Sequence, residues 1–171
     1  MEQCRNDLKS LTLEMYEVDY SQPAFLEVMG IYERSQTNDL IKSVVIYEKD
    51  TMVDGIYLVH HKEAIERGSI IIKIFIVSDN EIKEYYNKIQ AFDEAGVETY
   101  IVRRESIGPD SRLLADFLLY KNIVAISTTG PDGMLSRIKI TAQPHDFEDY
   151  KHRFEELLKL AHPFSEFAQI A

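Results

Sequence analysis

Polar side chains follow two strands that the sequence predicts at 70–77 and 97–102, at the point where each strand ends. In an open parallel sheet, ligands bind beyond the carboxyl ends of the strands, where loops and helix N-termini converge. A helix N-terminus and one arginine can together hold a phosphate or carboxylate, through the helix dipole and bidentate hydrogen bonds. We therefore predict a small-anion site at these strand ends, made by Ser78, Asp79 and Asn80 after the first strand and by Arg103 and Arg104 after the second.

The same residues also have an ordinary structural interpretation. Ser78 and Glu81 have the spacing of a capping box, in which the serine begins the helix that follows. The two arginines can form surface ion pairs with Glu98, Glu105 or Asp110, and such pairs are common and weak. The sequence leaves both interpretations open.

A further candidate for this site is Asp116, a lone carboxylate in the apolar segment 113–120. Acids in apolar surroundings are often functional, so we include Asp116 among the predicted ligand-binding residues. The alternative is that its side chain lies on the exposed side or at the end of a strand.

His60 and Lys62 begin the pattern His-x-Lys-x-x-x-x-Asp, in which phospholipase D enzymes use the histidine as a nucleophile toward a phosphodiester. The pattern fails at Arg67, which stands where the aspartate is required. The segment also predicts a helix rather than a strand, so we interpret it as a polar helix face.

His145, Asp149 and His152 are spaced to share one face of a helix, where they could ligate a metal. No second group of ligands accompanies them, and the charged residues around them are typical of a solvated face. Motifs for serine nucleophiles, phosphate loops and paired cysteines are missing. We predict no metal, no cofactor and no catalytic residue.

The composition limits the partners of the chain. Its 171 residues carry a formal charge of −10, which repels nucleic acid phosphates and anionic lipids, so we expect no direct nucleic acid binding and no membrane binding. The one cysteine, Cys4, is typical of a reducing cytoplasm. The remaining partners are a protein or a small anionic ligand, and a homodimer is an option because dimers are the commonest closed assemblies.

The hydrophobic pattern predicts an α/β fold, a three-layer α/β/α sandwich with a mixed sheet that is parallel at its centre and antiparallel at one edge. We expect a single domain over 1–171, with an N-terminal strand and helix in 1–40 and the α/β core in 41–171. Strands are predicted at 11–18, 41–47, 70–77, 97–102, 113–120, 123–127 and 135–140, and helices at 23–34, 50–67, 78–95 and 146–162.

Several segments together resemble an uncharacterised bacterial domain family related to the phospholipase D fold. The resemblance rests on AIERGSIIIKIFIVSD (64–79), EAGVETYIVRRE (94–105), ADFLLYKNIVAI (115–126), GPDG (130–133) and HDFEDYKHRFEELLKLAHPFSEF (145–167). It implies a phospholipase-D-like fold that lacks the catalytic motif. In active relatives the histidine and lysine lie on the strand that corresponds to 114–120, and this segment contains neither.

Three functions remain open. The first is a non-catalytic cytoplasmic binding or regulatory module, in signalling, transcriptional control or defence, that recognises a protein or small anion at the strand ends. The second is a phosphodiester hydrolase with a rearranged site that uses His60, Lys62 or Asp116. The third is an acidic protein that imitates DNA or occupies a basic partner, an interpretation that the lysines scattered among the acids weaken.

Overall fold

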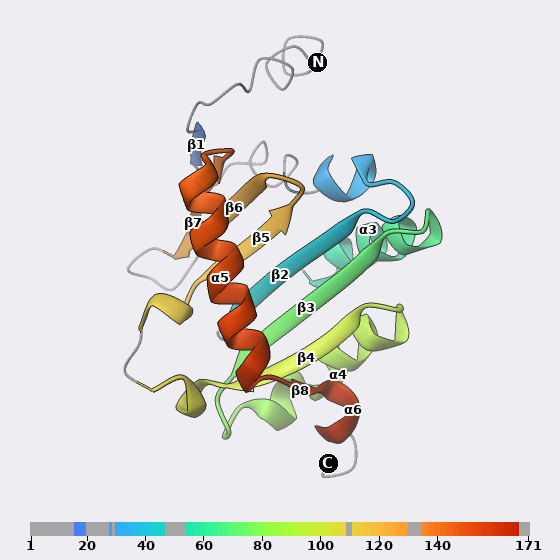
Figure 1. Cartoon of the computed structure of the whole chain (residues 1–171). Helices are drawn as coiled ribbons and strands as arrows, with labels where there is room; N and C mark the ends of the chain where they lie inside the picture. The colour runs from blue at the N-terminus through green and yellow to red at the C-terminus, as the bar shows by residue number, and fades with distance from the viewer. Residues whose placement is uncertain are drawn as a thin grey trace.

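The fold is organised around a mixed sheet (Figure 1). The computed structural model describes residues 16–19, 28, 30–46, 54–108, 111–129 and 135–167, and eight strands in these residues form one sheet in the order β1-β7-β6-β5-β2-β3-β4-β8. The strands are β1 (Tyr16–Asp19), β2 (Leu40–Ile46), β3 (Ile70–Val77), β4 (Glu98–Arg103), β5 (Asp116–Tyr120), β6 (Ile123–Thr129), β7 (Leu135–Thr141) and β8 (His162–Pro163).

The centre of the sheet is parallel, as predicted. β3 pairs in parallel with both β2 and β4, and its apolar residues from Ile74 to Val77 are buried under helices on the two faces. β5, β6, β7 and β1 continue the sheet in antiparallel pairs beyond β2. The predicted mixed sheet is therefore confirmed, with one addition: β8 pairs antiparallel with β4 at the opposite edge.

Helices cover both faces of the sheet, which confirms the predicted three-layer sandwich. α3 (Asp54–Glu66) and α4 (Ile82–Glu94) lie behind the sheet in Figure 1, and α5 (Pro144–Leu160) crosses its front. Two short turns of 3-10 helix, η1 (Arg104–Ile107) and η2 (Ser111–Leu113), follow β4, and α6 (Phe164–Phe167) follows β8. No helix of the described residues is long and apolar enough to cross a membrane.

Two hydrophobic cores lie on the two faces. The core under α3 and α4 also contains Val28 and Tyr32 from a helical segment over 28 and 30–34, in agreement with the predicted helix. The core under α5 contains Phe154 and Leu157. The predicted positions 11–15, 23–27, 29, 47–53 and 130–134 lie outside the described residues.

Local predictions for two helices are wrong. α4 begins at Ile82, and its N-cap is Glu81, which makes no side-chain cap hydrogen bond, so the predicted capping box does not form. In α3 the apolar Val59 is exposed, whereas His61 is fully buried. The polar-face interpretation of this helix therefore fails at His61.

Arg67 has a structural role that its motif position does not suggest. Its Nη2 donates to the Tyr32 carbonyl at 2.5 Å, and its Nε donates to the carbonyl of the buried Ser35 at 3.3 Å. The guanidinium therefore satisfies carbonyls at the end of the 30–34 helix, a common use of arginine at a helix C-terminus.

We expect Arg67→Ala to lower the free energy of unfolding by about 1–3 kcal/mol, because it leaves partly buried carbonyls without a charged donor. Urea unfolding followed by circular dichroism measures this loss. Lys62→Ala, an exposed change on α3, the helix that ends just before Arg67, is the control and should have little effect. An Arg67→Ala midpoint equal to that of the control would contradict the role.

Candidate functional site

The two adjacent arginines leave β4 on opposite faces of the sheet. Successive side chains of a strand alternate between faces, and Ile101 belongs to the core under α3 and α4 while Val102 belongs to the core under α5. Arg103, the last residue of β4, lies on the α4 face beside α6. Arg104 begins η1, which packs against α5, and is half-buried. The two therefore do not form one cationic site.

Asp79 and Arg103 are brought together as the sequence predicted for one edge of the sheet. The Nε of Arg103 lies 3.4 Å from Oδ1 of Asp79, and the Asp79 amide lies 3.4 Å from Oε1 of Glu105. Both members of the ion pair are about half exposed, so the pair orients Arg103 more than it stabilises the fold. Ser78 and the exposed Asn80 flank Asp79 in the chain.

Asp116 lies apart from this pair. It is the first residue of β5, and its Oδ1 accepts the Ile46 amide at 2.8 Å where β2 ends. Since β2 and β3 separate β5 from β4, Asp116 and Arg103 are three strand spacings apart, about 14 Å. The predicted residues therefore share an edge of the sheet but not one pocket.

The pocket at Arg103 contains residues that the sequence prediction missed. It has a volume of about 220 Å³ and is lined by Arg103, His162, Glu166 and Phe167. The Arg103 guanidinium lies 5.7 Å from the Phe167 ring centroid, and Nδ1 of His162 lies 3.3 Å from Oε2 of Glu166. β8 brings these residues to β4, because Ile101 pairs with His162.

Arg103 and Glu166 each use only one of their charged atoms for an ion pair with another described residue. Among the described residues, Arg103 uses Nε for Asp79, and its two terminal nitrogens have no hydrogen-bond partner. Glu166 likewise uses Oε2 for His162, which leaves Oε1 without a partner in the same part of the chain. The arrangement can accept a small polar ligand without breaking an existing contact.

The histidines of α3 lie elsewhere. His60 is 3.9 Å from carboxylate oxygens of Glu33 and Glu63, on the side of the helix that faces the 30–34 segment. His61 packs against the rings of Tyr32, at 4.3 Å, and Phe92, at 5.2 Å between centroids. Burial, reinforced by the nearby charge of Lys73, holds the pKa of His61 well below its usual value.

His145, Asp149 and His152 do not converge. Each contacts a different neighbour on α5: His145 lies 3.0 Å from Asp146, Asp149 lies 2.6 Å from Arg153, and His152 lies 3.4 Å from Glu156. Within the described part of the chain, no three His, Cys, Asp or Glu side chains are placed to hold a metal ion. The solvated-face interpretation accounts for these contacts.

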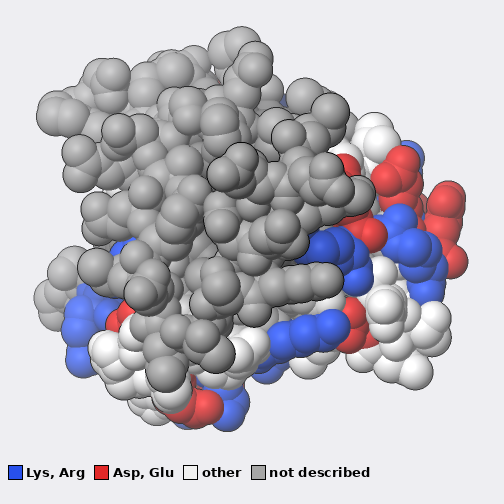
Figure 2. Space-filling model, turned by 90° about the horizontal axis from the view of Figure 1, so that it is seen from above, with Lys and Arg blue, Asp and Glu red and all other residues white. Residues whose placement is uncertain are grey.

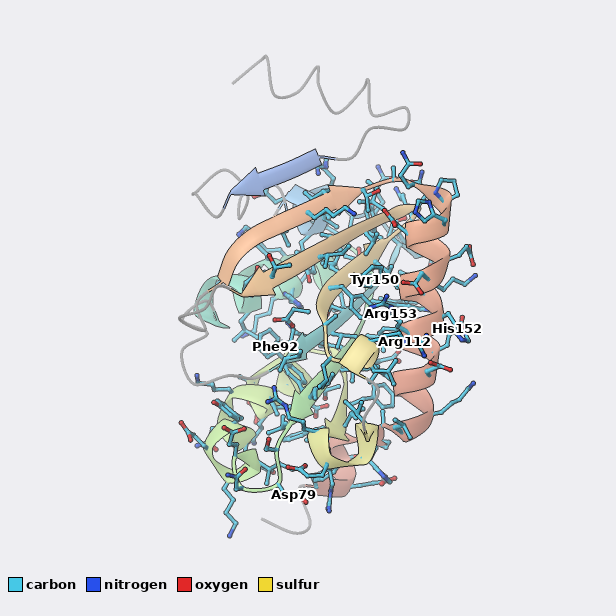
Figure 3. All side chains as sticks on the ribbon, turned by 90° about the vertical axis from the view of Figure 1, so that its left-hand side faces the viewer. Asp79, Phe92, Arg112, Tyr150, His152 and Arg153 are labelled. Atoms are coloured by element: carbon cyan, nitrogen blue, oxygen red, sulfur yellow. The ribbon has the colours of Figure 1, made fainter. Side chains whose placement is uncertain are left out.

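A second charged cluster lies against α5, and its role is structural. Arg153 donates to Asp149 and, at 2.8 Å, to the carbonyl of Arg112 in η2, and its guanidinium lies 4.5 Å from the Tyr150 ring. Figure 3 shows Tyr150, Arg153 and Arg112 together beside the helix, with Asp79 at the far end of the molecule. This cluster fixes η2 to α5. Burial is the main cause that raises the pKa of the Tyr150 hydroxyl.

Charges of both signs mix on the surface. On the described part of the face in Figure 2, blue lysine and arginine side chains are interspersed with red carboxylates. A protein that imitates DNA would be expected to carry a more continuous acidic surface. This distribution does not favour that alternative.

Comparison with known proteins identifies the fold. No family model and no curated protein sequence matches the chain. Among solved structures, Nuc from Salmonella typhimurium, a phospholipase D family member, matches with a TM-score of 0.63 and 11% identity over 88% of this chain and 98% of Nuc. NucT from Helicobacter pylori matches with a TM-score of 0.56 and 8% identity over 88% of this chain and 99% of NucT. The chain therefore has a phospholipase-D-like fold.

A third structure corrects one expectation from the sequence. TrmBL2, an archaeal chromatin protein with a novel mode of DNA binding, matches with a TM-score of 0.60 and 12% identity over 95% of this chain. The match spans 58% of TrmBL2. The expectation of no direct nucleic acid binding is therefore wrong as an inference from the −10 charge, because net charge does not describe how the charges of a surface are distributed.

Proposed function

We propose that the chain is a non-catalytic cytoplasmic binding module of phospholipase-D-like fold, which recognises a small ligand through an anionic group held by Arg103. The observation that carries the proposal is the pocket beside Asp79, which orients this guanidinium, while no described residue contacts the terminal nitrogens of Arg103 through a hydrogen bond. An arginine with two terminal nitrogens available can bind a carboxylate or phosphate in a bidentate manner.

The strand that would carry a phosphodiesterase nucleophile supports the non-catalytic role. β5 and the residues before it, 113–120, contain no histidine or lysine, and Asp116 there accepts a backbone amide. Without a histidine on this strand, the covalent phosphohistidine route of that enzyme class is not available there. His60 and Lys62 lie on α3 and not on this strand.

The setting that we propose for the module is transcriptional control or signalling. The structural likeness to a DNA-binding chromatin protein is compatible with this setting, and so is the restriction of the pocket to a small ligand. In such a module, ligand binding would stabilise one state of the domain by mass action.

Arg103→Ala is expected to weaken ligand binding at least tenfold while leaving the melting temperature nearly unchanged, because the side chain is half exposed. The probes are a thermal-shift panel of phosphates, carboxylates and amino acids, with titration calorimetry on each compound that stabilises the protein. Lys159→Ala removes an exposed cation from α5 and is the matched control.

The proposal fails if Arg103→Ala weakens the binding of no compound, or if Lys159→Ala weakens binding to the same extent. Hydrolysis of bis(4-nitrophenyl) phosphate by the purified protein would instead favour the rearranged phosphodiesterase. His60→Ala and Asp116→Ala would then locate that activity.

A further inference from the structure

The pocket at Arg103 presents opposite charges rather than one. Among the described residues, its lining has one arginine, Arg103, and one carboxylate, Glu166, and the side chain of Glu166 is 62% exposed. Outside the lining, Asp79 contacts Arg103 and Glu105 contacts the Asp79 backbone. Carboxylates therefore outnumber the arginine around this pocket.

These charges do not suit a simple anion. A ligand with only negative charge would gain from Arg103 but would be repelled by the carboxylates of Glu166, Asp79 and Glu105. A ligand with only positive charge would leave the guanidinium without a partner. A small molecule with an anionic and a cationic end, and no net charge, would avoid both penalties and use both open groups.

The size and the wall of the pocket limit such a ligand further. The volume of about 220 Å³ is below the roughly 300–1,000 Å³ of pockets that bind drug-sized molecules. The apolar wall is the Phe167 ring, which lies on α6 next to the Glu166 carboxylate in the chain. A pocket of this size therefore has room for a ligand with two charged ends and a small apolar part.

We propose that this pocket binds a free α-amino acid or a closely similar zwitterion. The ligand carboxylate pairs with the terminal nitrogens of Arg103, the ammonium pairs with Oε1 of Glu166, and the side chain lies against Phe167. This inference rests on the proposed function, because it assigns a ligand class to the same pocket. His162, which holds Oε2 of Glu166, is a positioning residue in this arrangement.

The test compares an amino acid with molecules that lack one of its charges. Titration calorimetry at pH 7.5 first ranks the amino acids and then compares the best binder with its deaminated acid and its decarboxylated amine. For leucine these are 4-methylpentanoate and 3-methylbutylamine. We expect the amino acid to bind at least tenfold more tightly than either.

Variants of Glu166 separate this inference from the proposed function. Glu166→Gln should weaken binding of the amino acid about tenfold and should not weaken binding of the deaminated acid, because the change removes a repelling carboxylate. Arg103→Ala should weaken binding of both. Glu155→Gln, an exposed change on α5, is the control, and circular dichroism checks that each variant is folded.

The possible results point to different conclusions. If the deaminated acid binds as well as the amino acid and Glu166→Gln changes nothing, the zwitterion assignment is wrong but the anion-binding module stands. If no compound depends on Arg103, both proposals are wrong. Tight binding of phosphate that requires Arg103 and not Glu166 would also overturn the amino acid assignment.

Discussion

Replacing Phe92 with alanine is expected to lower the free energy of unfolding by about 3–5 kcal/mol, the usual cost of removing a buried phenylalanine. Phe92 is 2% exposed on α4 and joins the helix to the sheet. Its ring centroid lies 5.2 Å from that of His61 and 5.7 Å from that of Phe75. Lys73 is 5% exposed, and its amino group lies 4.3 Å from the same centroid.

The loss should lie in the upper part of that range, because Lys73 would also lose the ring nearest to its charge. Urea unfolding measures it as a lower midpoint with an unchanged slope. Asn87→Ala, an exposed change on the same helix, should cost less than 0.5 kcal/mol by comparison. A Phe92→Ala loss below about 1 kcal/mol would mean that the packing under α4 is not as described.

The stability of the protein is expected to fall as the pH decreases below 6.5, because His61 is buried in its neutral form. Its Nδ1 lies 2.5 Å from the Tyr57 carbonyl, which can only accept, so Nδ1 carries the hydrogen and Nε2 does not. Within the described residues, Nε2 is buried without a hydrogen-bond partner. Protonation would place a cation there, close to that of Lys73.

The direction of the effect follows from the pKa values of the two states. The unfolded chain has a histidine pKa near 6.5, and the folded pKa is well below it, so the unfolded state binds the proton first. Stability is therefore complete above pH 6.5 and is lost progressively as the pH falls from 6.5 toward the folded pKa. The slope is at most about 1.4 kcal/mol per pH unit.

Urea unfolding at several pH values between 7.5 and 5.0 tests this expectation. His61→Asn retains an amide that can donate to Tyr57 and should remove the slope, while His152→Asn, an exposed change on α5, should retain it. Asp39 does not contribute to the slope in this pH range, because hydrogen bonds from Tyr120 and from the Gln36 amide lower its pKa from 3.8. An unchanged slope in His61→Asn would show that another group is responsible.

The sequence predicts the sheet well because its central strands have a strong and local signal. The apolar run 70–77 can only be covered on both faces, and the structure places it between two parallel neighbours. The pattern fails where a buried residue is polar. His61 and Lys73 lie in the core under α3 because aromatic rings surround them, and the sequence does not show which rings meet.

The candidate site was predicted only in part for a similar reason. Asp79 and Arg103 follow neighbouring parallel strands, so their meeting follows from the topology. His162 and Glu166 reach Arg103 through β8, a strand of two residues that is too short to show any alternation. The one available signal is Pro163, which cannot donate to a strand and is therefore confined to an edge position.

The position of β8 at the edge of β4 would link binding of the proposed ligand to the solubility of the protein. β8 covers part of the outer edge of β4, and an uncovered strand edge invites pairing with other chains and aggregation. A ligand that contacts both Arg103 on β4 and Glu166, just after β8, would stabilise the pairing of β8 with β4. We therefore expect the protein without the ligand to expose this edge more often and to aggregate more readily than the protein with the ligand bound.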